Sequence, residues 1–286
     1  MSIQVPTEAQ VIEAAGFIKS KNPDFKASIA VVLGSGFGEI GDHMDVSPSP
    51  MIIPFTTIPN FLKCTVEGHL GNLILASLGG VPIFCMQGRF HFYEGYSMQQ
   101  ITFYVRVLAK LGVKGIVFTN AAGCLVPGWN LGEISLITDH INFMGSNPLI
   151  GPNLDMFPPF STRFPDMSNC YDKEMREMIR KGAEDIGVKL KEGVYFGMAG
   201  PAYESDAEKK MMQISGAQVV GMSTVPEVIV ARHSGIRCAC LSVVTDMCTP
   251  EATPTHEEIL EVSHKAAATV GKVLEHTLPM LIKIIN

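Results

Sequence analysis

A guanidinium, an imidazole and a phenol alternate along the chain at Arg89, His91 and Tyr93. Alternate side chains of an extended segment lie on the same side of the backbone, so these three groups are expected to share a face. An arginine binds phosphate oxygens through a bidentate fork, and an aromatic ring can cover the flat face of a sugar. The pattern is typical of an oxyanion site beside a sugar. An exposed turn with one ion pair to Glu94 explains the same residues.

A glycine-rich stretch, Gly34-Ser35-Gly36-Phe37-Gly38, follows the apolar run 29–33. Backbone N–H groups in such a loop can cradle an anion, and the Ser35 hydroxyl would add a donor. The spacing does not fit a dinucleotide-binding fingerprint, because Glu39 stands where the third glycine should be. A tight turn that lets a strand and a helix pack together is the alternative interpretation.

Two further segments could bring backbone groups close to a ligand. The small residues Asn120-Ala121-Ala122-Gly123 follow a predicted strand at 115–119 and would let a flat ligand approach. Ser223 stands just before a helix capped by Thr224 and Glu227, where unpaired N–H groups and the helix dipole favour phosphate. Close strand–helix packing and an ordinary N-cap serine are the respective alternatives.

Two carboxylates and two histidines are expected at loop entrances. Glu204 lies just outside a helix cap, and Asp246 follows the predicted strand 237–245. His256 occupies the first position of the last helix, where the dipole favours neutral imidazole. His69 stands in a predicted turn. Each of the four is also compatible with a solvated surface position.

The composition favours an enzyme-sized globular protein. The chain has 286 residues, of which 47% are hydrophobic and only 17% charged, so partner subunits are expected to cover part of its surface. A net charge of -6 argues against a protein that binds nucleic acid or acidic membranes. The seven scattered cysteines are expected to be reduced and mostly buried. Residues 1–21 lack a signal-peptide core, and no run reaches transmembrane length. These features predict a cytoplasmic protein.

Hydrophobic periodicity and capping signals predict alternating strands and helices. Helices are expected from Pro6, from Ser97 to before Gly112, over 173–187, and after the caps at Ser205, Thr224 and Thr255, and strands at 29–33, 73–78, 81–86, 115–119, 193–198, 219–222 and 237–245. This alternation indicates an α/β fold, in which ligands bind at the C-terminal ends of strands. The segment 142–172 shows no convincing helix, and irregular segments of that length are usually functional or part of an interface.

Taken together, the motifs resemble those of the trimeric class of purine nucleoside phosphorylases, and the resemblance covers nearly the whole chain. The matching stretches are Gly34-Ser35-Gly36, Gly68-His69, 87–96, 119–123, 139–142, Arg163-Phe164-Pro165, Ala199-Gly200-Pro201 and 220–228. The resemblance implies a single domain over 1–286, with a twisted mixed sheet partly closed into a barrel and flanked by helices. It also implies a homotrimer. The implied reaction is reversible phosphorolysis of a purine ribonucleoside to free base and ribose 1-phosphate. Inorganic phosphate would be the co-substrate, with no metal and no organic cofactor.

The same resemblance assigns roles to individual residues. Phosphate would be held by Ser35, Arg89, His91, Ser223 and the Ala121 backbone, with His69 nearby on a mobile loop; Tyr93, Met222, Tyr203 and His256 would surround the ribose; Glu204 and Asp246 would face the purine; and Phe164 would complete a neighbouring subunit's site. Asp246, Glu204, His91 and His256 are the residues implied to be catalytic.

The sequence departs from the family at Asp246, where asparagine is usual. An asparagine amide donates to purine N7, whereas an ionised aspartate only accepts and favours a 6-amino group. A protonated Asp246 could donate to N7 if burial raises its pKa. Aspartate occurs at this place in the related methylthioadenosine phosphorylases. Glu204 argues for a 6-oxopurine instead, because it needs the N1–H that adenine lacks.

These residues predict a purine nucleoside phosphorylase that prefers inosine and guanosine and tolerates adenosine. A methylthioadenosine phosphorylase would account for Asp246 but not for Glu204 or for His256 beside the ribose. A non-catalytic nucleoside-binding protein would keep the pocket without phosphate-dependent turnover. A dinucleotide-binding oxidoreductase would need the missing third glycine.

Overall fold

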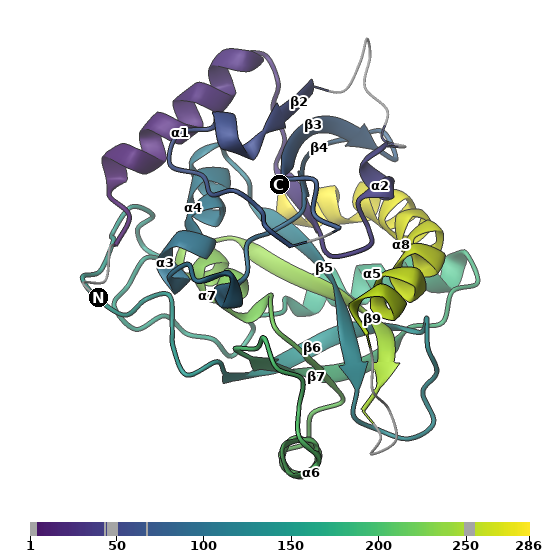
Figure 1. Cartoon of the computed structure of the whole chain (residues 1–286). Coiled ribbons are helices and arrows are strands. Elements are labelled where there is room, and N and C mark those ends of the chain that lie inside the picture. Colours follow the sequence, from purple (N-terminus) through teal and green to yellow (C-terminus); the bar gives the residue numbers. More distant parts are fainter. Residues whose placement is uncertain (1–4, 43, 45–50, 67, 249–254) are drawn as a thin grey trace.

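The computed structural model describes residues 5–42, 44, 51–66, 68–248 and 255–286 (Figure 1). Its strands are β1 (Ile29–Leu33), β2 (Met51–Pro54), β3 (Asn72–Leu78), β4 (Val81–Gln87), β5 (Gly115–Cys124), β6 (Ile134–Phe143), β7 (Lys191–Met198), β8 (Val219–Gly221) and β9 (Arg237–Met247). Its α-helices are α1 (Glu8–Lys21), α2 (Glu39–Asp42), α3 (Met98–Ile101), α4 (Phe103–Lys110), α5 (Lys173–Asp185), α6 (Asp206–Ile214), α7 (Val225–His233) and α8 (His256–Ile285). Short 3-10 turns, η1 and η2, span Phe55–Thr57 and Phe92–Glu94.

Within the described residues, the strands form one mixed sheet in the order β2-β3-β4-β1-β5-β8-β7-β6-β9. The last strand, β9, also pairs in parallel with β5. The strands β5, β8, β7, β6 and β9 therefore close into a barrel, from which β1, β4, β3 and β2 extend as an open sheet. This arrangement confirms the predicted mixed sheet that is partly closed into a barrel.

Helices cover the sheet on two sides (Figure 1). On one side α1 packs against α4, and α4 against α7; on the other side α5 packs against α8, which also reaches β9, β3 and β4. Strand β1 shows why both sides are needed, because all five of its residues are buried. Ala30 and Val32 belong to the first apolar core, whereas Ile29, Val31 and Leu33 belong to the second. A central strand that is apolar at every position needs a helical layer on each face.

The predicted elements occur in the expected order, with three corrections, and the short elements β2 and α2 were not predicted either. Strand β5 continues to Cys124, so Asn120-Ala121-Ala122-Gly123 lies within the strand rather than in a loop after it. The helix predicted from Ser97 is interrupted at Thr102, which separates α3 from α4. Strand β6 was not predicted, because its outer residues are polar and exposed beyond Ile137. The segment that follows β6, up to Asp172, contains no helix in the described structure, as expected.

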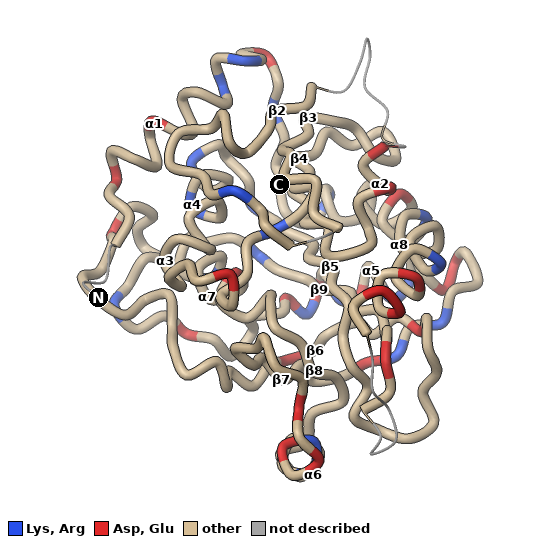
Figure 2. Tube along the Cα trace, viewed as in Figure 1, with Lys and Arg blue, Asp and Glu red and all other residues tan. Residues whose placement is uncertain are grey.

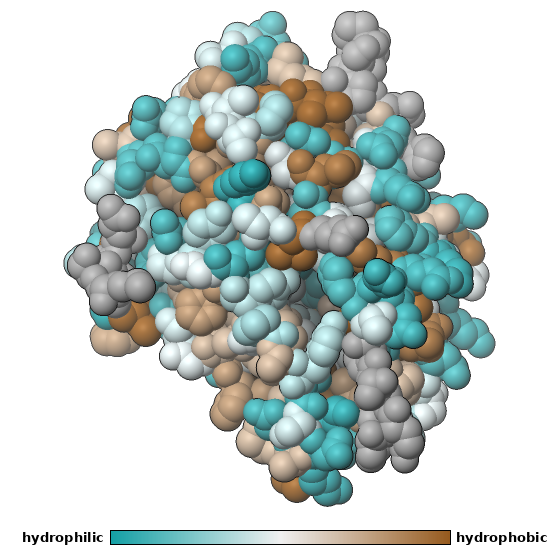
Figure 3. Space-filling view, in the orientation of Figure 1, coloured by the Kyte–Doolittle hydropathy of each residue, from teal (hydrophilic) through white to brown (hydrophobic). Residues whose placement is uncertain are grey.

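Charged residues of both signs are spread over the outer helices and loops (Figure 2). The face shown in Figure 3 mixes hydrophobic groups with hydrophilic ones, and hydrophilic residues dominate over α8. All seven cysteines carry free thiols, and all but Cys64 are buried, as predicted. None of the helices in the described ranges has both the length and the apolar character needed to cross a bilayer.

Candidate active site

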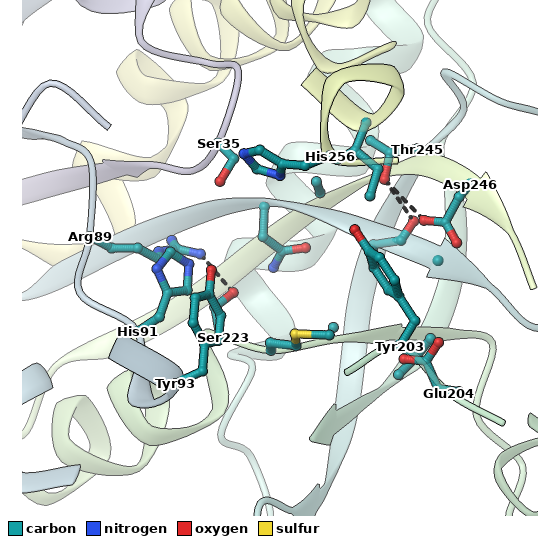
Figure 4. Close-up of a pocket in the computed structure, with 18 residues that line it drawn as sticks. Ser35, Arg89, His91, Tyr93, Tyr203, Glu204, Ser223, Thr245, Asp246 and His256 are labelled. Carbon is teal, nitrogen blue, oxygen red and sulfur yellow. Dashed lines mark hydrogen bonds between the residues drawn. The ribbon is translucent and has the colours of Figure 1, made fainter. Parts of the chain in front are cut away.

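One cleft gathers the C-terminal ends of β1, β4, β5, β8 and β9 together with the start of α8. It contains about 670 Å³ of empty space, including the part open to solvent. All of the predicted site residues except His69 and Phe164 line it, namely Ser35, Arg89, His91, Tyr93, Ala121, Tyr203, Glu204, Met222, Ser223, Asp246 and His256. Arg89, His91, Tyr93 and Ser223 lie at one end, and Tyr203, Glu204 and Asp246 lie at the other (Figure 4).

Arg89 is the buried cation of the first end, with 1% of its surface exposed. Its Nη1 donates hydrogen bonds to Ser223 Oγ at 3.0 Å and to Thr224 Oγ1 at 3.2 Å, while Nη2 has no hydrogen-bond partner among the residues that the structure describes. Burial disfavours the charge, but the Glu227 carboxylate, 3.5 Å from Nε, raises the pKa of Arg89 above its usual value. The guanidinium is therefore charged and has donor capacity left for an anion.

Glu227 organises this end of the cleft. It is 2% exposed, and it accepts hydrogen bonds from the Tyr104 hydroxyl and, at 2.9 Å, from the Thr224 backbone N–H. Thr224 has a φ of 61°, in the left-handed region that few residues other than glycine adopt. The sequence predicted Glu227 only as a helix cap. Its contact with Arg89 was missed, because a capping signal is local and the arginine lies far away in sequence.

His69 stands behind Ser35 rather than in the cleft wall. The Arg89 backbone N–H donates to His69 Nδ1 at 3.1 Å, and His69 Nε2 lies 2.8 Å from Ser35 Oγ. Burial, reinforced by His91 and Arg89, holds the pKa of His69 well below its ordinary value, so the ring is neutral. Since Nδ1 accepts, Nε2 must carry the hydrogen and donate to Ser35 Oγ. The Ser35 hydroxyl hydrogen is then left to donate to a ligand.

His91 and Tyr93 form a stacked pair at the edge of the same end, with ring centroids 4.7 Å apart. The backbone N–H of His91 donates to Glu94 Oε1 at 2.6 Å. Burial opposes the charge of Glu94, but hydrogen bonds from His91 and Thr65 hold the pKa of this carboxyl at about 2. Glu94 therefore pairs with His91, whose Nδ1 lies 3.3 Å from Oε1, and Arg89 pairs with Glu227. The exposed turn of the alternative interpretation is wrong, because Arg89 and His91 are buried.

Two carboxyl groups mark the other end. Asp246 accepts from Thr245 Oγ1 at 3.3 Å, and Cys248 Sγ lies 3.7 Å from its second oxygen. Burial raises the pKa of Asp246. Burial also raises the pKa of Glu204, and the nearby Asp246 carboxyl adds to this effect. A raised pKa favours the protonated form of a carboxyl group, which can donate a hydrogen bond as well as accept one.

Two further predicted site residues, His256 and Phe164, lie in different parts of the structure. His256 begins α8 and lines the cleft between the two ends, close to Ser35 in Figure 4. Phe164 does not line the cleft of its own chain and is 87% exposed, with the Arg163 guanidinium 5.8 Å from its ring centre. Its predicted place in a neighbouring subunit's site stays a prediction.

Asn120 was not predicted as a functional side chain. It lines the cleft from within β5, is 2% exposed, and donates through Nδ2 to Thr224 Oγ1 at 2.9 Å. Its Oδ1 has no hydrogen-bond partner within the described part of the chain. The sequence signal was the small-residue stretch that follows Asn120, which pointed to the backbone rather than to the amide.

Known proteins resemble this chain both in sequence and in fold. The sequence pattern of the Phosphorylase superfamily matches residues 28–279. Purine nucleoside phosphorylase 1 of Bacillus subtilis is 44% identical over 268 residues, which cover 93% of this chain and 96% of that protein. The mouse purine nucleoside phosphorylase is 42% identical over 93% of this chain and 90% of its own length.

A solved structure of Schistosoma mansoni purine nucleoside phosphorylase in complex with adenosine superposes with a TM-score of 0.90. It is 37% identical to this chain and covers 97% of it and 99% of its own length. Because sequence and fold agree over almost the full length, the chain belongs to the purine nucleoside phosphorylases of the Phosphorylase superfamily.

Proposed function

We propose that the cleft transfers the ribosyl group of a purine ribonucleoside to inorganic phosphate, releasing free base and ribose 1-phosphate. One observation carries the proposal: a buried guanidinium stands at one end of the cleft, and two carboxyl groups stand at the other (Figure 4). The first end suits an oxyanion and the second suits the hydrogen-bonding edge of a purine. The ribose would lie between the two ends, where we assign it to Tyr93, Met222, Tyr203 and His256.

At the phosphate end, Arg89, Ser35, Ser223 and the Ala121 backbone hold the anion, and His91 completes the set. Bond cleavage at C1′ builds positive charge on the sugar, which the bound phosphate stabilises and then attacks. Holding phosphate in line with the bond makes the step effectively unimolecular, an effect worth ~7–11 kcal/mol of the barrier. His69 acts through Ser35, by directing the Ser35 hydroxyl hydrogen toward the anion.

At the base end, Glu204 and Asp246 divide the hydrogen bonds to the purine. An ionised Glu204 accepts from N1–H of a 6-oxopurine, and a protonated Asp246 donates to N7 as the base leaves. The raised pKa of Asp246, caused by burial, favours its protonated form. These two hydrogen bonds favour inosine and guanosine. Because an ionised Asp246 could accept from a 6-amino group, we also infer turnover of adenosine. Adenosine and hypoxanthine in the similar Schistosoma structures support this substrate class.

The assembly and surroundings are part of the same proposal. We propose a homotrimer in which Phe164 completes the neighbouring site, because that ring is exposed and lies in the long irregular segment after β6. A single domain over 1–286, a cytoplasmic location and a reaction without metal or organic cofactor remain our predictions. Full activity after dialysis against a chelator would support the last of these.

The test of the proposed base choice is a substrate panel at saturating phosphate. Release of free base is measured for inosine, guanosine, adenosine and methylthioadenosine. We expect the highest kcat/KM for inosine and guanosine, a lower value for adenosine and the lowest for methylthioadenosine. A higher value for methylthioadenosine than for inosine would assign the site to a methylthioadenosine phosphorylase. Binding of inosine without turnover would identify a nucleoside-binding protein.

A further inference from the structure

The thiol of Cys248 lies beside the carboxyl group that we place against the purine. Cys248 follows β9 directly and is 7% exposed. Its backbone N–H donates to the Cys124 carbonyl at 2.8 Å, which fixes it across from the end of β5. The Sγ atom lies 3.7 Å from Asp246 Oδ2, and Thr245 Oγ1 lies 3.3 Å from Asp246 Oδ1. Each oxygen of the Asp246 carboxyl therefore has one donor from its own strand end.

The space that holds this thiol exists because residue 123 is a glycine. Gly123 faces Asp246 in the β5–β9 pairing, at the point where the register shifts. A Cβ at this position would lie 2.6 Å from Cys248 Sγ and 2.9 Å from Asp246 Oδ2, distances that real contacts do not reach. The thiol also packs into a small apolar cluster with Leu125, Met212 and Val220. It is thus enclosed on several sides and held against the carboxyl.

We propose that Cys248 is a positioning residue, whose thiol fixes the plane of the Asp246 carboxyl and stabilises its ionised form. The proposal rests on the proposed function of Asp246 at the base end of the cleft. A protonated thiol donates, and a donor stabilises an ionised carboxylate more than a protonated one. Burial raises the pKa of Cys248, which keeps the thiol protonated.

The consequence concerns the choice between 6-oxo and 6-amino purines. Burial alone would push Asp246 further toward its protonated form, which donates to N7 of inosine. The thiol and the Thr245 hydroxyl oppose that shift. They therefore keep the Asp246 carboxyl ionised in a fraction of the molecules, and this ionised form accepts from the 6-amino group of adenosine. Cys248 would widen the range of bases that the cleft accepts.

Other titratable groups also face Asp246 and are unchanged by a substitution at 248. Glu204 and Tyr203 lie on the segment before α6, Lys209 lies on α6, and the Cys124 thiol lies at the end of β5. The Cys124 thiol donates to the Val126 carbonyl at 3.2 Å instead of to Asp246. Cys124 is therefore a matched control: a buried thiol of the same neighbourhood without that contact.

The test compares pH profiles of kcat/KM for inosine and adenosine in the wild type, Cys248→Ala, Cys248→Ser, Cys124→Ala and Asp246→Asn. Inosine turnover should fall as pH rises through the Asp246 pKa. In Cys248→Ala this fall should move to higher pH by about half to one unit, the size expected for the loss of one hydrogen bond. The ratio of inosine to adenosine turnover should then rise roughly three- to tenfold above the wild-type inflection. Cys248→Ser retains a donor and should keep the inflection near the wild-type value, as should Cys124→Ala.

Two outcomes would overturn the inference in different ways. If Asp246→Asn removes the inflection but Cys248→Ala leaves it in place, Asp246 meets the purine and the thiol does not position it. If Asp246→Asn keeps the wild-type profile and base ratio, the assignment of Asp246 to the base fails, and the inference fails with it.

Cys248→Val fills the same space without a donor and should behave as Cys248→Ala, which separates the lost hydrogen bond from a lost packing volume.

Discussion

Arg89 depends on residues far away in sequence for its orientation. Ser223 and Thr224 receive its hydrogen bonds, and the Glu227 carboxylate lies beside it in a buried site. Such a cation cannot relax into water when its ligand is absent, so it stays arranged for the anion. This preorganisation is the physical basis for assigning phosphate to that end of the cleft.

The first prediction at this scale concerns phosphate affinity. Arg89→Ala should raise the phosphate KM roughly ten- to hundredfold, because a hydrogen bond to a charged group contributes ~1.5–3 kcal/mol. Initial rates at saturating inosine and varied phosphate measure the change. Arg180→Ala, at an exposed arginine paired with Glu192, is the control and should keep the wild-type KM. An unchanged phosphate KM in Arg89→Ala would mean that phosphate binds elsewhere.

Substitution of Glu204 should change which purine bases the protein prefers. Its substitution by glutamine replaces an ionised acceptor by a neutral amide with a single acceptor oxygen, so the buried purine donors are paired less well, which is costly. Glu204→Gln should lower kcat/KM for inosine and guanosine by at least tenfold more than for adenosine. The three values are measured side by side at saturating phosphate. Equal losses on all three nucleosides would show that Glu204 does not contact the base.

At the scale of elements, the start of α7 connects helix capping to the site. Glu227 caps the Thr224 N–H, accepts from Tyr104 on α4, and pairs with Arg89 after β4. A single carboxylate therefore joins two helices and a strand end behind the proposed phosphate position. Because its partner Arg89 is 1% exposed, loss of the Glu227 charge leaves a buried cation without compensation.

This arrangement predicts a link between stability and phosphate. Glu227→Gln should lower the free energy of unfolding by about 3 kcal/mol, because breaking a buried ion pair leaves one charge unpaired. Saturating phosphate should restore more stability to this variant than to the wild type, since the anion then compensates Arg89. Thermal unfolding with and without phosphate measures both effects. Glu192→Gln breaks an exposed pair with Arg180 and should change stability little. Equal losses in the two variants would contradict the account.

The elements also show what the sequence could predict. Capping boxes at Ser97, Ser205 and Thr255 are local signals, and each marked a helix start that the structure contains. The apolar run at 29–33 was equally clear, because a strand buried on both faces needs no alternation. Strand β6 escaped prediction, because its polar second half pairs with β7 and shows no apolar pattern.

The residues of the site could be predicted from the sequence about as well as the helices and strands. The motifs and the family resemblance identified most of the functional side chains of the cleft, although not Asn120, and all of the predicted ones except His69 and Phe164 line it. The contacts behind them were not predictable, because they join distant segments. Examples are Glu227 with Arg89, His69 with Ser35, and Asn120 with Thr224. None of these pairs has a spacing or a composition that marks it in the sequence.

At the scale of the whole molecule, closure of β5, β8, β7, β6 and β9 into a barrel brings the strand ends to one cleft. The segment after β6 leaves Phe164 exposed outside that cleft. We predict that Phe164→Ala raises the nucleoside KM several-fold and leaves the phosphate KM and the trimeric sedimentation unchanged. Ile214→Ala, at a comparably exposed apolar side chain on α6, is the control and should alter neither KM. A fully active monomer at assay concentration would contradict a shared site.

The central claim is that phosphate, not water, accepts the ribosyl group in this cleft. The most direct measurement follows both products from inosine, with phosphate present and with phosphate removed. We predict equimolar hypoxanthine and ribose 1-phosphate when phosphate is present, and no release of base above background when it is absent. Base released at the same rate without phosphate, with free ribose as the second product, would contradict the claim.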